Sequence, residues 1–146
     1  MAAAIGYLAE VGRAVTRQEA AAGKSGIRED CRAAMSAIRH YEQGLSRELL
    51  RVLRDRGAEI YGLKEEDQVR DRVPTVCFNL PGLSPAAVTE AAAAAGIGIR
   101  DGHMYAPRLM RRLGLAVESG AVRVSLAHYN TVEEVRQLGS VLSRLR

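Results

Sequence analysis

The sequence predicts an α+β fold in which a long amphipathic helix precedes a small, mainly antiparallel sheet that helices cover on one face. Three observations support this prediction. Apolar residues recur at helical spacing between residues 27 and 52, shorter segments with strand-like alternation follow them, and glycines, prolines and capping residues separate those segments. With 47% hydrophobic residues in 146 and no low-complexity tract, the chain is long enough to bury a sizeable core.

The N-terminal part of the chain is predicted to be helical. Apolar residues at helical spacing start from Met1 with no capping residue ahead of them, namely Ile5, Leu8, Val11 and Val15. A polar, glycine-containing loop or hinge is expected over 16–26. One long helix is then predicted to begin at residue 27 and to end at Gly57. Its apolar stripe consists of Ile27, Cys31, Met35, Ile38, Leu45, Leu49 and Val52.

Short strands and helices alternate beyond residue 57. The expected strands cover 58–63, 73–80, 97–101 and 121–129, and the expected helices cover 85–96, 106–113 and the segment from 132 onward, with a polar loop or turn over 65–72. Ser84 before Pro85 is typical of a helix start, and Thr131 with Glu134 forms a capping box. Successive side chains of the last strand are expected to point to opposite faces of the sheet. Val122, Val124 and Leu126 would face the core, and Arg123, Ser125 and Ala127 would face the other way.

Composition argues against several classes of function. The net charge of +4 comes almost wholly from arginine, because the only lysines are Lys24 and Lys64 and the other 19 of the 21 basic residues are arginines. Nucleic acid is not an expected partner, since these arginines are spread beside acids and no aromatic cluster is available for stacking bases. No apolar run is long enough to cross a membrane, and the first residues do not read as a signal peptide.

The cysteines and histidines do not form a recognisable ligand pattern. Cys31 and Cys77 lie within apolar patterns, so they are interpreted as reduced core residues of a cytoplasmic protein. The three histidines, His40, His103 and His128, are scattered without the spacing of metal ligands. No metal site is expected.

The candidate binding residues lie between residues 99 and 130. Arg100 and Arg123 fall in predicted strands, where a rigid backbone can direct a planar guanidinium at a carboxylate or phosphate. Arg123 could instead form an ordinary surface ion pair, and Arg100 could either make a second anion contact or form a salt bridge with Asp101 or another acid. His103 and Tyr105 share a tight loop, where they would either edge an active site or serve as a turn histidine and a packed tyrosine.

Two segments carry a resemblance to a known family. Residues 100–106, RDGHMYA, and residues 122–135, VRVSLAHYNTVEEV, resemble the C-terminal part of pyridoxal phosphate-dependent class V aminotransferases, a group that includes the cysteine desulfurases. The resemblance implies a large-domain helix end and hinge over 1–26 and a C-terminal small domain over 27–146. It also implies that Arg123 binds the α-carboxylate of the substrate. Tyr105 stands at the desulfurase nucleophile position, and a tyrosine cannot carry a persulfide because that chemistry requires a thiolate.

The lysine that would hold the cofactor has no counterpart with the family's motif. Lys24 lies in a polar loop and Lys64 in a charged turn. The sequence is therefore interpreted as the C-terminal fragment of an enzyme that binds pyridoxal phosphate when complete, with neither a bound cofactor nor a catalytic residue expected in this chain alone. The expected partners are an amino-acid substrate in the intact enzyme and a large domain or homodimer partner. The alternative is a non-catalytic interaction module that keeps the small-domain fold.

Overall fold

A computed structural model describes residues 2–19 and 26–145 of the chain. Contacts within the chain divide it into two compact units, Met1–Glu42 and Gln43–Arg146. The long helix α2 (Ile27–Asp55) contributes residues to both of them.

The first unit packs α1 (Ala2–Glu19) against the beginning of α2 through small residues. Ala9 is 1% exposed, and a Cβ atom on Gly12 would lie 1.8 Å from the carbonyl oxygen of Asp30. The two helices can therefore approach this closely only because Gly12 has no side chain. Arg13 Nη1 donates to Oδ2 of the buried Asp30 at 2.9 Å, so the carboxylate has a charged partner inside the contact.

Two predictions for this part of the chain need correction. The loop predicted from residue 16 was wrong at its beginning, because α1 continues to Glu19 and the Thr16 hydroxyl donates to the Gly12 carbonyl at 3.0 Å within the helix. Residues 20–25 of that predicted loop lie outside the described residues. The predicted stripe on α2 was wrong at Ile27 and Met35, which are 59% and 54% exposed.

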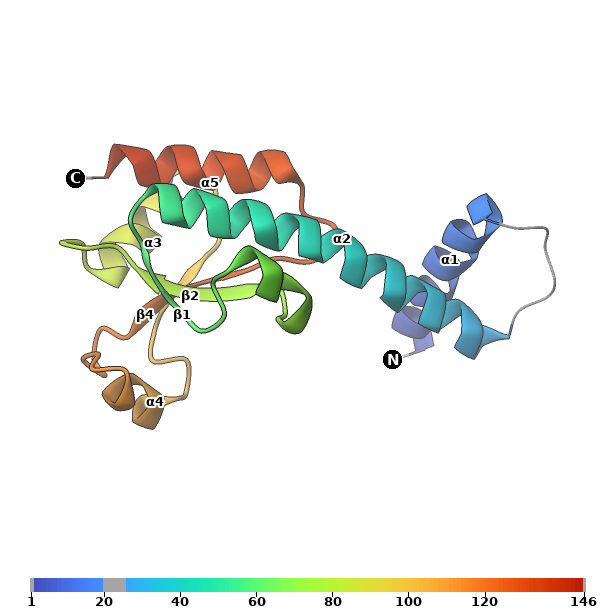
Figure 1. Cartoon of the computed structure of the whole chain (residues 1–146), viewed down its shortest axis with the longest axis horizontal. Coiled ribbons are helices and arrows are strands. Elements are labelled where there is room, and N and C mark those ends of the chain that lie inside the picture. Colours follow the sequence, from blue (N-terminus) through green and yellow to red (C-terminus); the bar gives the residue numbers. More distant parts are fainter. Residues whose placement is uncertain (1, 20–25, 146) are drawn as a thin grey trace. The chain divides into compact units, whose positions relative to one another are not determined.

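The second unit contains a four-stranded antiparallel sheet in the order β1-β2-β4-β3. Its strands are β1 (Glu59–Tyr61), β2 (Thr75–Asn79), β3 (Arg100–Gly102) and β4 (Ala121–Ser125). The later part of α2, α3 (Pro85–Ala94) and α5 (Val132–Arg144) cover one face of this sheet, whereas α4 (Pro107–Arg112) lies on its other side (Figure 1). The predicted α+β class is therefore confirmed.

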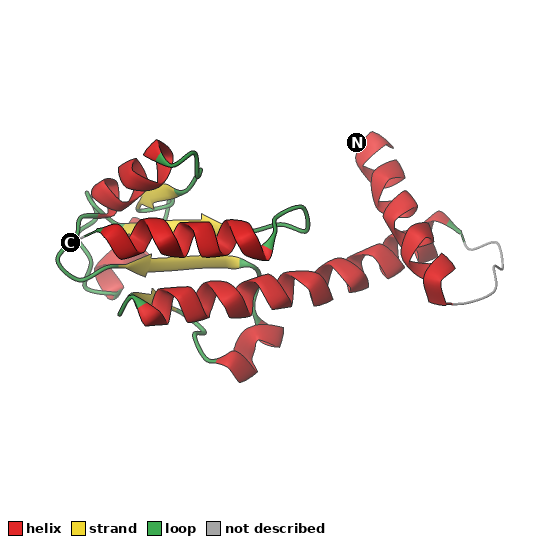
Figure 2. Ribbon diagram, turned by 90° about the horizontal axis from the view of Figure 1, so that it is seen from above, coloured by secondary structure: helices red, strands yellow, loops and turns green. Residues whose placement is uncertain are grey.

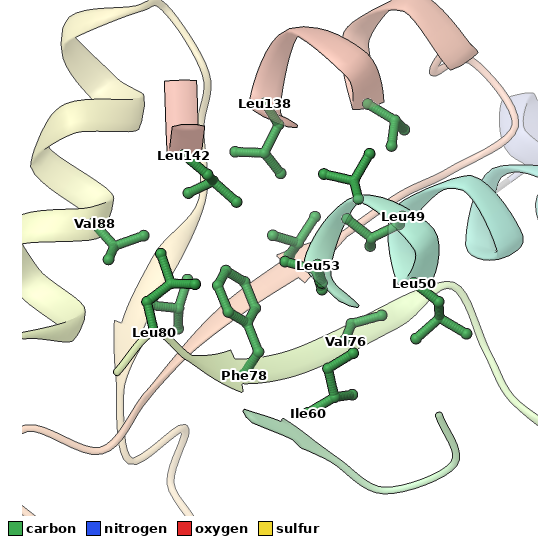
Figure 3. Packing of buried hydrophobic residues seen from close by; sticks show 14 of the residues in the cluster. Leu49, Leu50, Leu53, Ile60, Val76, Phe78, Leu80, Val88, Leu138 and Leu142 are labelled. Carbon is green, nitrogen blue, oxygen red and sulfur yellow. The ribbon is translucent and has the colours of Figure 1, made fainter. Parts of the chain in front are cut away.

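Alternation along the strands separates a buried face from an open one. Val76, Phe78 and Val122 are completely buried and face the helices. Leucines from α2 and α5 meet them there, with Val88 of α3 at one side (Figure 3). Figure 2 shows α5 and the later part of α2 running side by side above the strands. Each such large apolar side chain stabilises the fold by about 1.5–3 kcal/mol.

The predicted caps set the ends of the helices. The Ser84 hydroxyl accepts from the Ala87 amide at 3.2 Å, which confirms the start of α3. Glu134 Oε2 accepts from the Thr131 amide at 2.8 Å, and Thr131 Oγ1 accepts from the Glu134 amide at 3.2 Å, which confirms the capping box of α5. Gly57 follows α2 in the left-handed region with φ 64°, as predicted for the residue that ends the helix.

Three predicted element boundaries were wrong, each for a local reason. The strand predicted from residue 97 begins only at Arg100. The reason is that the Ile97 amide donates to the Ala92 carbonyl at 2.9 Å and so belongs to the end of α3. β4 ends at Ser125 because the Ala127 amide donates to Asn130 Oδ1 at 2.8 Å and the chain turns there. The predicted polar loop over 65–72 contains a 3-10 helix, η1 (Glu66–Asp71), that the buried Val69 anchors.

The cysteines were wrongly assigned to the core. Cys31 and Cys77 are both half-buried and free. Cys77 precedes the buried Phe78 on β2, so alternation turns it toward the open face. Among the residues that the structure describes, no helix is long and apolar enough to span a membrane, and no three potential metal ligands come together.

A charged cluster links α2 to α5 across the top of the core. Arg51 Nη2 and Arg136 Nε both donate to Glu48 Oε1 at 2.8 Å, and Arg51 Nε donates to Oε2 at 3.0 Å. These bonds, those from Arg51 first, lower the pKa of Glu48 to about 2.

Replacing Glu48 by glutamine should therefore destabilise the fold in a pH-dependent way. Since the folded-state pKa lies below the unfolded value near 4.5, the stabilisation by Glu48 is present above pH 4.5 and is lost as the pH falls toward 2. Urea unfolding at pH 7 should show a loss of about 1 kcal/mol for Glu48→Gln, since both arginines are half-exposed and screened. The difference from the wild type should shrink steadily below pH 4.5. Glu90→Gln, at an exposed position of α3, is the control, and an equal loss for Glu48→Gln at pH 7 and pH 3 would contradict the linkage.

Candidate substrate-binding site

The register of the sheet brings Arg123 and Arg100 together on its open face. Arg123 of β4 pairs with Cys77 of β2 on one side and with Arg100 of β3 on the other, and Cys77 in turn pairs with Tyr61 of β1. Residues directly opposite each other in antiparallel strands project from the same face. Tyr61, Cys77, Arg123 and Arg100 therefore form one row across the sheet, which we call the open-face row.

The loop between β3 and α4 carries the other two predicted residues in an unusual conformation. Met104 and Tyr105 both have positive φ values, 49° and 60°, which is uncommon for residues with a side chain. The Tyr105 amide donates to His103 Nδ1 at 3.1 Å, and the Ala106 amide donates to the His103 carbonyl at 2.7 Å. Tyr105 is 94% exposed, so the interpretation as a packed tyrosine does not fit.

Gly120 and Asn79 hold this loop against the beginning of β4, and sequence analysis missed both. A Cβ atom on Gly120 would lie 2.1 Å from the Gly102 carbonyl carbon and oxygen and 2.6 Å from the His103 amide nitrogen. Asn79 Nδ2 donates to the Gly120 carbonyl at 3.2 Å, and Asn79 Oδ1 accepts from the Val122 amide at 3.4 Å. The glycine directly before the last strand was the available signal in the sequence.

These elements surround one pocket of ≈ 480 Å³ on the open side of the sheet. All four predicted site residues line it, together with neighbouring residues of β3 and the loop and two acids, Asp101 and Glu118. The complete lining is Arg100, Asp101, Gly102, His103, Met104, Tyr105, Glu118 and Arg123. The structure thus brings the predicted residues together in one concave site of a size that suits a small molecule.

Neither arginine in this pocket has an acidic partner among the described residues. Asp101 accepts instead from the Thr89 hydroxyl of α3 at 2.8 Å, so the salt bridge considered for Arg100 and Asp101 is not formed. Arg123 is half-buried, and its Nε is buried without an acceptor. An unpaired buried donor is costly, and the guanidinium of Arg123 is incompletely hydrogen-bonded in this conformation.

Cys77 lies beside this charge but is not an activated thiol. Burial raises the pKa of the Cys77 thiol, and the guanidinium groups of Arg123 and Arg72 offset part of that rise. The thiol is therefore mainly protonated at neutral pH. It does not provide the nucleophile that Tyr105 lacks.

Comparison with known proteins identifies the family. The model of the class V aminotransferase family matches residues 27–138, and the chain belongs to that family. The aminotransferase-like protein FGM3 of Gibberella zeae is 45% identical over 105 residues, which cover 70% of this chain and 26% of that protein. A cysteine desulfurase of Synechococcus elongatus is 36% identical over 89 residues, covering 61% of this chain and 14% of the relative.

Solved structures of desulfurases share the fold. The apo structure of a cysteine desulfurase from Thermococcus onnurineus superimposes with a TM-score of 0.71 at 30% sequence identity, covering 81% of this chain and 28% of the other. The cysteine desulfurase CsdA of Escherichia coli gives a TM-score of 0.63 at 22% identity, which shows the fold alone. The chain thus covers between 14% and 31% of the length of these four proteins.

Class V aminotransferases are pyridoxal phosphate enzymes, but the described residues do not fit that cofactor on their own. The cofactor needs a lysine for its Schiff base, and no lysine lines the pocket within the described ranges. Lys64 is exposed between β1 and η1, and Lys24 lies outside the described residues. Among the described residues, the lining of this pocket therefore provides no Schiff-base lysine.

Replacing Gly120 by alanine should displace the His103 loop. Gly57→Ala is a matched control, because Gly57 has a similar φ of 64° against 61° for Gly120 but has open space around it. Both variants incur about 1–2 kcal/mol of left-handed strain, whereas only Gly120→Ala adds a collision worth about 1–3 kcal/mol. Urea unfolding should therefore show the larger loss for Gly120→Ala, and NMR should show shifted amide signals of Gly102 and His103 in that variant alone. Equal losses in the two variants would contradict the contact.

Proposed function

We propose that this chain is the substrate-carboxylate-binding small domain of a pyridoxal phosphate-dependent class V enzyme that acts on an amino acid. The observation that supports this most directly is Arg123. Its half-buried guanidinium faces a pocket, and its buried Nε has no acceptor. In the family, the arginine at this place in the last strand binds the α-carboxylate of the substrate.

The surroundings of Arg123 suit carboxylate binding. β4 lies between β2 and β3, so hydrogen bonds on both edges hold the strand that carries Arg123. A guanidinium fixed in this way loses little entropy when it forms two parallel bonds to a carboxylate. Partial burial excludes competing water and strengthens those bonds.

The remaining pocket residues have supporting roles in this proposal. Arg100 is exposed at the mouth of the pocket and makes a second anion contact with the substrate. His103 and Tyr105 form the edge of the site. Because Tyr105 cannot carry sulfur as a desulfurase cysteine does, no residue of this chain is proposed as a catalytic nucleophile.

The other functional parts are supplied from outside the pocket. We propose that residues 1–26 are the end of a large-domain helix and a hinge, and that 27–146 form the small domain. A large domain or a homodimer partner would then contribute the lysine and bind the cofactor. The cytoplasmic location and the absence of nucleic-acid and membrane partners stay predictions from the sequence.

A non-catalytic interaction module is the second candidate. Within the described residues the pocket lining contains no lysine, which is compatible with both candidates. The two candidates differ in one property, because only the enzyme domain requires a partner that completes a cofactor site.

Arg123→Lys should separate substrate binding from folding. Lysine keeps the charge and loses the planar fork, so amino-acid affinity in the assembled enzyme should fall by about tenfold to a hundredfold, equivalent to about 1.5–3 kcal/mol. The free energy of unfolding should change by less than about 0.5 kcal/mol, since Arg123 lies on the open face. Arg111→Lys on α4, outside the pocket lining, is the control and should change neither quantity. Unchanged affinity in Arg123→Lys would show that Arg123 is structural.

The isolated chain should not form a Schiff base with pyridoxal phosphate. Borohydride reduction followed by mass spectrometry should find no stoichiometric adduct, because no lysine lines the described pocket. Stoichiometric labelling of Lys24 or Lys64 would overturn this expectation.

Adding a large-domain chain should produce a lysine-linked chromophore if the chain is an enzyme domain. Failure to produce this chromophore would favour the interaction module.

A further inference from the structure

We propose that the amino-acid substrate carries a second anionic group on its side chain, and that Arg100 binds this group while Arg123 binds the α-carboxylate. This inference rests on the proposed function. It goes beyond that function because it names the substrate class, an acidic amino acid, and assigns Arg100 the specificity for it.

The pairing of the two arginines has a cost in the free chain. Arg100 and Arg123 are direct cross-strand partners on the open face, and like charges at such positions destabilise a sheet. Moving either residue by one position along its strand would turn its side chain to the opposite face. A ligand with two anionic groups offsets the repulsion at both positions.

No protein group neutralises this pair among the described residues. On β3 the next residue, Asp101, is bonded to Thr89 of α3. On β2 the neighbour of Arg123 is Cys77, a thiol whose burial raises its pKa, and Arg72 adds positive charge near it. From the segment before β4, Glu118 lines the pocket but is exposed and forms no ion pair with either arginine.

The two arginines lie at different depths in the pocket. This difference favours a ligand with two separate anionic groups over a ligand whose single anionic group contacts both arginines. Arg123 is half-buried with a buried Nε, whereas Arg100 is exposed at the rim. The pocket of ≈ 480 Å³ is also larger than a single carboxylate requires. An acidic amino acid can place its α-carboxylate in the deeper position and its side-chain anion at the rim.

The test uses isosteric pairs of amino acids with the full 146-residue chain. Aspartate and asparagine have the same shape and differ by one negative charge, as do glutamate and glutamine, so NMR titration with all four isolates the contribution of the second anion. Aspartate or glutamate should bind about fivefold more tightly than the corresponding amide, which is the upper range for an exposed ion pair. Added salt should reduce this preference. Arg100→Gln should abolish the preference and leave amide binding unchanged. Arg111→Gln, an exposed arginine outside the pocket lining, should keep the preference.

The outcomes distinguish this inference from the proposed function. Equal binding of the acids and their amides to the wild type, or a preference that survives Arg100→Gln, would overturn the second-anion site. Equal weakening of both members of a pair by Arg100→Gln would assign Arg100 to the α-carboxylate and overturn it as well. In each of these cases the proposed function stands if Arg123→Gln weakens all four ligands. If no amino acid binds the wild type up to its solubility limit, the second-anion site is overturned, and Arg123→Lys in the assembled enzyme decides the proposed function separately.

A second measurement checks the cost of the arginine pair. Arg100→Gln should raise the unfolding midpoint of the ligand-free chain slightly, because it removes a like charge opposite Arg123. A lower midpoint would show that Arg100 is a structural residue and would overturn its assignment.

Discussion

The antiparallel pairing of β4 with β2 on one edge and β3 on the other determines both the core and the site. One face of β4 contributes Val122 and Val124 to the cluster beneath α2, α3 and α5. The same alternation places Arg123 on the opposite face beside Cys77 and Arg100. Because a shift of one residue would exchange these faces, the burial of the apolar residues fixes the face on which the arginine lies.

The loop that completes the pocket depends on a backbone contact. Gly120 lies so close to Gly102 that a side chain would not fit, and Asn79 bonds the backbone on both sides of Ala121. Met104 and Tyr105, both with positive φ, come next in the chain after the residues that Gly120 approaches. Strain of this kind persists only where the surrounding structure holds it, and here a glycine and one amide side chain on rigid strands hold it.

Local patterns in the sequence predicted much of this fold. Capping residues gave the start of α3 and α5, and alternation gave the faces of β4 correctly. The errors arose where burial depends on what packs against a residue, which periodicity does not specify. Ile27 and Met35 have helical spacing and are nevertheless exposed, whereas α1 is buried at Ala9 and lies close to Asp30 at Gly12, which no apolar stripe identifies. The four predicted site residues do share a pocket, but the role of Asn79 depends on contacts across the sheet that sequence spacing does not reveal.

The position of Cys77 gives the protein a built-in chemical reporter. Of the two free thiols, only Cys77 lies in the open-face row, and Arg123 favours its thiolate. An anion that bound Arg123 would offset that favourable charge, so alkylation of Cys77 would slow as the site filled. The chain contains no tryptophan for a fluorescence signal. The alkylation rate of a single native thiol can therefore report occupancy without any introduced label.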